Sequence, residues 1–132
     1  VTFALVEFES GAAGTIEANW TAAGRTMDLS WEITGTKGAL AFSQERMNEL
    51  LLCKGSGGGR TSGFTKIEAG PNHPPYGNFC PAPGHHLGFN DLKVIEVAQL
   101  IDAIGGGFNH GPDFQEALEV QKVVSKIATS CG

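Results

Sequence analysis

The sequence has few charged residues and no cluster of basic ones. Of its 132 residues, 17% are charged, nine are Lys or Arg, and the formal net charge is −5. Binding to nucleic acid requires grouped basic side chains that replace the counterions of the phosphates, and here they are scattered along the chain. We therefore expect no nucleic-acid partner.

Long apolar runs and a secretory leader are also missing. No stretch approaches the roughly 20 apolar residues that a membrane helix requires, and no leader pattern opens the chain. The three cysteines, Cys53, Cys80 and Cys131, are widely spaced and form no C-x-x-C pair. This spacing favours idle or buried thiols in a reducing compartment over a disulfide framework or a zinc site. We expect a cytoplasmic protein with no membrane partner.

A dinucleotide fingerprint is absent as well. The glycine-rich segment from Gly55 to Arg60 comes nearest to G-x-G-x-x-G, but Arg60 stands where the third glycine belongs. No helical pattern follows whose N-terminus could receive a pyrophosphate. The segment is predicted to be a surface turn, and no cofactor is expected in this chain.

The first two-thirds of the sequence has the alternation of β-strands. Residues 1–8 are apolar on both faces, which predicts a central strand, and residues 15–21 form its return strand after a Gly/Ala turn. Apolar and polar residues alternate over 26–34, which predicts a half-buried antiparallel strand. Shorter strands are expected near 40–42, 50–52 and 64–67.

The period changes to that of helices near residue 90. Apolar stripes predict helices over 91–104 and 113–130, the first with Asn90 or Asp91 as its cap. Asp113 with Glu116 three residues later forms a variant of the capping box. The predicted class is α+β: an open, mainly antiparallel sheet with two C-terminal helices packed on one face, in a single domain of residues 1–132. Because Val1 already lies in a strand-like run, we expect the chain to be part of a longer protein.

Three motifs in order resemble one known family. Trp31–Leu40 is similar to the E-I-x-G-x-x-G-x-L strand–turn–strand of the C-terminal domain of the glucose–fructose oxidoreductase/inositol dehydrogenase (Gfo/Idh/MocA) family. Phe8–Ile16 resembles that family's F-x-[SN]-G-A-x-G-x-I hairpin, and the segment from Pro112 to Ser130 resembles its closing P-x-x-x-A-L helix, with four residues here between Pro112 and Ala117.

The resemblance implies a function for a longer parent protein. Members join an N-terminal Rossmann domain to this open-sheet domain and transfer hydride between NAD or NADP and a hydroxyl-bearing carbon of a sugar, inositol or related polyol. The fingerprint, the catalytic Lys and the D-x-x-x-H pair of the family normally precede this region, and the sequence contains no D-x-x-x-H. We therefore expect no catalytic residue here, and no activity from this chain alone.

Four residues are candidates for substrate binding. The resemblance implies that the entry to the long strand faces the substrate pocket, which makes Arg25 and Met27 candidates; the alternative is a solvated Arg and a core Met. His85 and His86 stand in a Pro/Gly-rich loop, where imidazoles could bind sugar hydroxyls, serve only in the loop, or less plausibly bind metal. We expect no metal.

Two functions share this fold. The first is the substrate-binding and assembly domain of an NAD(P)-dependent oxidoreductase, which forms a homo-oligomer through its sheet face. The second is a non-catalytic oligomerisation or ligand-binding module. The sequence upstream of residue 1 would distinguish them.

Overall fold

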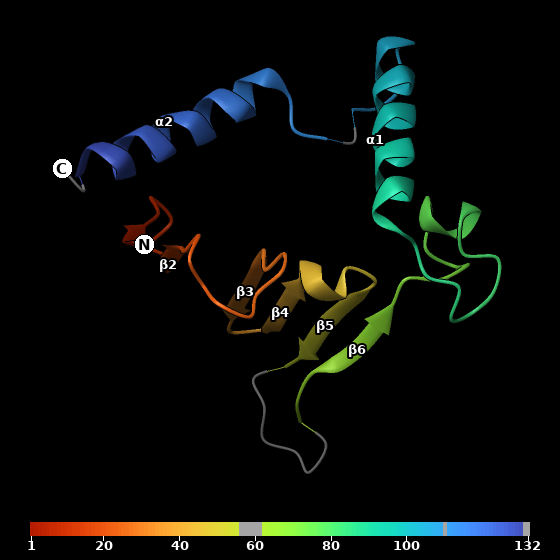
Figure 1. The fold of residues 1–132 in the computed structure, drawn as a ribbon, viewed down its shortest axis with the longest axis horizontal. Helices are drawn as coiled ribbons and strands as arrows, with labels where there is room; N and C mark the ends of the chain where they lie inside the picture. Colours follow the sequence, from red (N-terminus) through yellow and green to blue (C-terminus); the bar gives the residue numbers. More distant parts are fainter. Residues whose placement is uncertain (56–61, 110, 131–132) are drawn as a thin grey trace. The chain divides into compact units, whose positions relative to one another are not determined.

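The computed structural model, drawn in Figure 1, describes residues 1–55, 62–109 and 111–130. The chain divides into two compact units, one made of residues 1–24 and 99–132 and the other of residues 25–98.

The first unit begins with a β-hairpin. Strands β1 (Thr2–Glu7) and β2 (Ala13–Ala18) pair antiparallel in a two-stranded sheet. In its turn, Phe8 N–H donates to the carbonyl of Ala12 and Gly11 N–H donates to the carbonyl of Phe8, each over 2.8 Å, and Gly11 supplies the positive φ of +83°. The prediction that the first strand is central is wrong. β1 has β2 as its sheet neighbour, and one of its faces is open, with Leu5 89% exposed.

Two helices follow close to their predicted bounds. α1 spans Phe89–Ile104 and α2 spans Phe114–Ser130. At the start of α2 the capping box forms in both directions: Glu116 N–H donates to Asp113 Oδ1 over 2.9 Å, and Asp113 N–H donates to Glu116 Oε2 over 3.1 Å. α1 begins at Phe89, two residues earlier than predicted, so Asn90 and Asp91 lie in its first turn rather than before it. Asp91 Oδ2 accepts from the N–H of Gly88, the residue before the helix, over 2.7 Å. Within the described residues, neither helix is long and apolar enough to cross a membrane.

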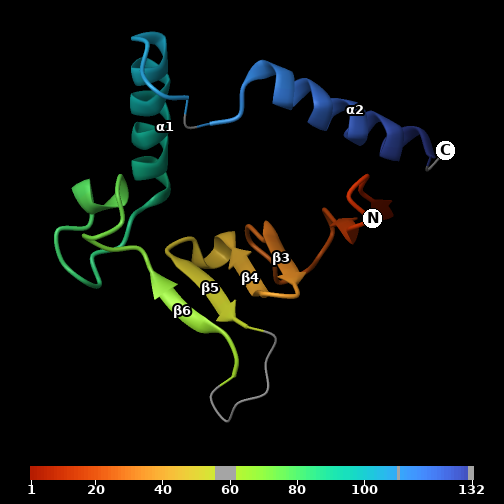
Figure 2. The same ribbon diagram turned by 180° about the vertical axis from the view of Figure 1, so that it is seen from behind.

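The second unit contains a four-stranded antiparallel sheet. Its strands are β3 (Ser30–Gly35), β4 (Gly38–Ser43), β5 (Glu49–Lys54) and β6 (Thr65–Glu68), and they lie side by side in sequence order. Figure 1 shows this order, and Figure 2 shows it from behind. Two short 3-10 helices accompany the sheet: η1 (Gln44–Arg46) between β4 and β5, and η2 (Tyr76–Asn78) after β6.

The register of the sheet separates an apolar face from a polar one. Trp31 is opposite Phe42, with ring centroids 5.9 Å apart, and Ile33 is opposite Leu40. Side chains of partners that face each other share one side of a sheet, so this face is apolar. Its members are Trp31, Ile33, Leu40, Phe42, Leu50, Leu52 and Ile67. The other face carries mostly small and charged residues, among them Glu32, Ala41, Glu49 and Lys66, together with Leu51.

The turn between β3 and β4 depends on Gly38, which belongs to the family-like motif. Its φ is +145°, and a Cβ built there would lie 2.2 Å from the carbonyl oxygen of Cys53 on β5. The motif glycine therefore permits a close approach of two backbones.

The small core of the second unit lies between its loops and α1. Cys80, Leu87 and Ile95 are its buried apolar residues, and Ala69 and Phe79 pack against them. Cys80 and Cys53 are free thiols, whereas Cys131 lies outside the described residues. The core fixes the loop that carries the candidate histidines against the first half of α1.

The long strand begins four residues later than predicted. Its apolar alternation starts at residue 26, but β3 starts at Ser30. The backbone of Thr26 instead bonds the side chain of Glu45, and Leu29 N–H bonds the carbonyl of Met27. Side-chain and turn hydrogen bonds thus replace the strand ladder over residues 26–28, whereas the carbonyl of Leu29 already accepts from Gln44 N–H over 2.9 Å.

The α+β class, the antiparallel sheets and the two helices are confirmed. α2 has no buried residue, and the packing of both helices on one sheet face stays a prediction. Most of the glycine-rich segment from Gly55 to Gly63 lies outside the described residues.

Candidate functional site

The candidate Arg25 lies in a hydrogen-bonded segment that leads into β3. Its Nη1 donates to Glu45 Oε2 over 2.9 Å, and its Nε lies 3.3 Å from Asp28 Oδ2. The other oxygen of Glu45 accepts from both the backbone N–H and the hydroxyl of Thr26, over 3.0 and 3.2 Å. One carboxylate thus fixes two consecutive residues.

These contacts lower the pKa of Glu45. The backbone N–H of Thr26 has the largest effect and the guanidinium of Arg25 the next, because both stabilise the charged form. Arg25 remains accessible: its side chain is 59% exposed, and among the described residues its contacts engage only Nε and Nη1. Its Nη2 group can therefore donate to a ligand hydroxyl or carboxylate.

Met27 lies in the same segment with its side chain exposed to 55%. It is not a core methionine, which was the alternative considered from the sequence. An exposed thioether two residues from an exposed guanidinium gives this segment one apolar and one polar group for a ligand.

The two candidate histidines stand at the end of a turn whose residues suit its type. His85 N–H donates to the carbonyl of Ala82 over 3.1 Å, and Gly84 between them has a φ of +82°. Pro83 and Gly84 occupy the positions that proline and glycine favour in a type II turn. Both His85 and His86 are exposed.

The residue after His86 is held by an amide. Asn48 Nδ2 donates to the carbonyl of Leu87 over 2.9 Å, and Leu87 N–H donates to Asn48 Oδ1 over 2.8 Å. The backbone of Asn48 also accepts from Ala69 N–H over 2.8 Å. Asn48 therefore joins the start of β5 to two distant segments.

Charged side chains on β5 and β6 form a row that includes Glu49, the residue after Asn48. Lys66 Nζ lies 2.5 Å from Glu68 Oε1 and 3.5 Å from Glu49 Oε1. The hydrogen bond to Glu68 and the charge of Glu49 raise the pKa of Lys66. The pKa of Glu68 is lowered, mainly by Lys66 and to a smaller extent by the charge of His86. His86 thus lies within electrostatic reach of this row.

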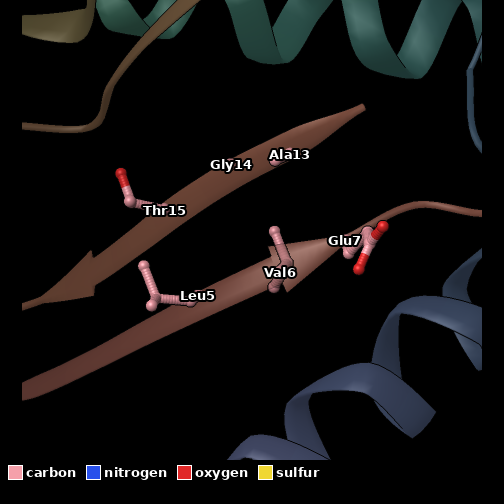
Figure 3. A pocket seen from close by; sticks show the side chains of 6 residues that line it. All are labelled: Leu5, Val6, Glu7, Ala13, Gly14 and Thr15. Atoms are coloured by element: carbon pink, nitrogen blue, oxygen red, sulfur yellow. The ribbon is translucent and has the colours of Figure 1, made fainter. Parts of the chain in front are cut away.

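The described residues hold no group of three His, Cys, Asp or Glu side chains arranged to bind a metal ion. A shallow hollow lies on the hairpin of the first unit, and none of the four candidates lines it. Figure 3 shows its lining side chains on β1 and β2: Leu5, Val6, Glu7, Ala13, Gly14 and Thr15. It carries one ionisable group, Glu7.

All four candidates belong to the second unit, but in two separate segments. In the part of the chain that the structure describes, no hydrogen bond or ion pair joins Arg25 or Met27 to either histidine. Sequence reasoning missed Glu45 and Asn48, which hold these segments. Their contacts span 19–20 and 39 residues of sequence, so no local pattern could have revealed them.

Comparison with known proteins finds matches within one family. Residues 1–41 match the family model described as the GFO/IDH/MocA C-terminal domain. The levoglucosan dehydrogenase of Pseudarthrobacter phenanthrenivorans is 32% identical over 126 residues, which is 96% of this chain and 32% of that protein.

Solved structures of oxidoreductases also match nearly the whole chain. An NAD binding oxidoreductase from Klebsiella pneumoniae is 41% identical with a TM-score of 0.83, over 96% of this chain and 34% of that one. Levoglucosan dehydrogenase in complex with NADH and levoglucosan is 33% identical with a TM-score of 0.80, over 97% of this chain and 36% of that one.

These matches run along nearly the whole chain and agree with the three motifs. The chain thus matches the C-terminal domain of the Gfo/Idh/MocA family over residues 1–41, and levoglucosan dehydrogenase along nearly its whole length. It spans about a third of the length of the relatives that it matches.

Proposed function

We propose that the chain is the substrate-binding and assembly domain of an NAD(P)-dependent oxidoreductase that acts on a sugar, inositol or related polyol. The observation that carries this proposal is the similarity to levoglucosan dehydrogenase over 96% of the chain. In this proposal residues 1–132 form one domain of a cytoplasmic protein, and an N-terminal Rossmann domain supplies the nicotinamide cofactor and the catalytic residues.

Arg25, Met27, His85 and His86 are the proposed substrate contacts. A polyol presents hydroxyls that both donate and accept, together with C–H surfaces that are weakly apolar. The guanidinium supplies donors, a neutral imidazole supplies one donor and one acceptor, and the thioether contacts the carbon skeleton. All four are exposed in the second unit, which is what a ligand requires.

Assembly through the apolar sheet face is the second part of the proposal. Ile33 and Trp31 on this face are 63% and 42% exposed. Contiguous exposed apolar surface in a water-soluble protein commonly marks an interface. A two-fold homodimer is the simplest closed arrangement that would cover it.

The test is to express the whole protein that contains this chain and to assay it with NAD⁺ and NADP⁺. Levoglucosan, D-glucose and myo-inositol are the substrates to compare, with formation of the reduced nicotinamide as the signal. We expect oxidation of at least one of them, and a raised KM in an Arg25→Ala variant. A whole protein that oxidises none of the three, binds neither cofactor and still oligomerises would support the non-catalytic module instead.

A further inference from the structure

One short connection of the second unit holds both proposed substrate segments. Residues 44–48 link β4 to β5, and η1 makes up most of them (Figure 1). Glu45 in this connection bonds Arg25 and Thr26, and Asn48 bonds the backbone on the C-terminal side of His86.

The contacts of Glu45 fix both the backbone and the side chain of the first segment. Its Oε1 accepts twice from Thr26, and its Oε2 accepts from Nη1 of Arg25 over 2.9 Å. A carboxylate that accepts charge-assisted bonds holds its donors in a narrower geometry than water would. The free Nη2 edge of Arg25 is thereby presented in one orientation.

Asn48 acts on the second segment in a different way. Its amide group donates to and accepts from the same residue, Leu87, as a neighbouring strand would. Leu87 is only 6% exposed and lies in the core with Cys80 and Ile95. His86 is therefore attached to a residue that is fixed through both its backbone and its side chain, while its own imidazole stays exposed.

We infer that the β4–β5 connection is the positioning element of the substrate site, in which Glu45 orients Arg25 and Asn48 orients His86 toward a polyhydroxylated substrate. The inference rests on the proposed function, because it takes Arg25 and His86 as substrate contacts. Glu45 and Asn48 are positioning residues, which act through those two and touch no substrate themselves. Sugars differ in the directions of their hydroxyls, so fixed donor directions are what selects among them.

The first experiment measures kinetics in the whole protein, with whichever of levoglucosan, D-glucose and myo-inositol it oxidises best. Glu45→Gln and Asn48→Ala should each raise KM about fivefold, the loss expected for one or two ordinary hydrogen bonds, with a smaller change in kcat. Glu96→Gln is the matched control, because Glu96 is an exposed carboxylate paired with Lys93 on α1 and lies in neither segment. It should leave KM unchanged.

Double variants separate positioning from general stability. If Glu45 acts through Arg25, Glu45→Gln should add nothing to KM in an Arg25→Ala background, and likewise Asn48→Ala in a His86→Ala background. Effects that persist in full in these backgrounds would mean a merely structural role and would overturn the inference. An unchanged KM in the single variants would overturn it too.

Hydrogen exchange gives a readout that does not depend on turnover. Glu45→Ala removes the acceptor of Thr26 N–H and should speed exchange of the Thr26 amide, and Asn48→Ala should do the same for the Leu87 amide. Unchanged rates would also contradict the inference. If Asn48→Ala does not fold, the isosteric Asn48→Asp keeps the acceptor for Leu87 N–H but sets an oxygen against the Leu87 carbonyl, and should give the same rise in KM.

The failures of the two proposals can be told apart. If the protein oxidises a polyol but Arg25→Ala and His86→Ala leave KM unchanged, the oxidoreductase stands and the positioning inference falls. If the protein oxidises no polyol, the proposed function falls and the inference with it.

Discussion

At the scale of single residues, the carboxylate of Glu45 accepts hydrogen bonds from two consecutive residues, Arg25 and Thr26. Its folded-state pKa is lowered by Thr26 and Arg25, so its carboxylate is more easily kept charged in the folded protein than in the unfolded one. Such a group contributes stability that is present above its unfolded pKa and lost as the pH falls through its folded pKa. The segment that carries Arg25 and Met27 is therefore sensitive to acid.

This linkage predicts a pH-dependent difference between the natural protein and the Glu45→Gln variant. Above the ordinary pKa of 4.5 the natural protein should be the more stable of the two, and the difference should shrink as the pH falls below that value. Urea unfolding at a series of pH values would measure it, with Glu96→Gln as the control for loss of an exposed carboxylate. A difference that stays constant from neutral to strongly acidic pH would contradict the assignment.

Gly38 gives a second prediction at this scale. Alanine there should cost more than about 2 kcal/mol of unfolding free energy, because its Cβ would meet the Cys53 carbonyl and its φ is unfavourable for any L side chain. Gly24 is the matched control: its φ is +86°, but nothing lies within 4 Å of a built Cβ. Gly24→Ala should cost about 1–2 kcal/mol. Equal costs, measured by chemical denaturation, would show that the close approach to β5 is unimportant.

At the scale of elements, α2 is a helix that buries little surface, so its N-terminal cap matters for its stability. None of its described residues is buried, so the capping box at Asp113 and Glu116 is its main visible anchor. Asp113→Ala should lower the stability by about 1 kcal/mol, whereas Asp113→Asn retains an acceptor and should cost less. Thermal unfolding followed by circular dichroism would measure both. A larger loss for the Asn variant would be inconsistent with capping.

The elements differ in how well the sequence predicts them. α2 and the strands at Leu40 and Leu50 follow from periodicity and caps, because these signals are local. The start of β3 does not follow from such local signals, because Thr26 bonds a carboxylate that lies 19 residues away in the sequence. The first strand was expected to be central because both its faces are apolar, yet apolar surface does not reveal which strand will cover it. The sequence offers Arg25, Met27 and the histidines as candidates for the site, whereas it gives no local signal for Glu45 and Asn48, whose contacts span 19 to 39 residues of sequence.

At the scale of the whole molecule, the apolar face of the four-stranded sheet is the surface most in need of a partner. Seven large apolar side chains share it, and the register places them on adjacent strands. Its possible occupants are a second copy of this face, the Rossmann half of a longer parent protein, and the chain's own helices, whose packing on one sheet face stays a prediction. We propose the second copy for the isolated chain.

The isolated chain should therefore form a dimer of twice its 13.8 kDa at micromolar concentration. Ile33→Lys puts a charge into the apolar face and should give a monomer, because an unpaired charge buried in an apolar contact is costly. Thr34→Lys is the matched control, since the next residue of β3 projects to the opposite face and should leave the dimer intact. Light scattering coupled to size exclusion measures the masses. A monodisperse monomer from the natural chain, or dissociation by Thr34→Lys alone, would count against the apolar face as the dimer interface.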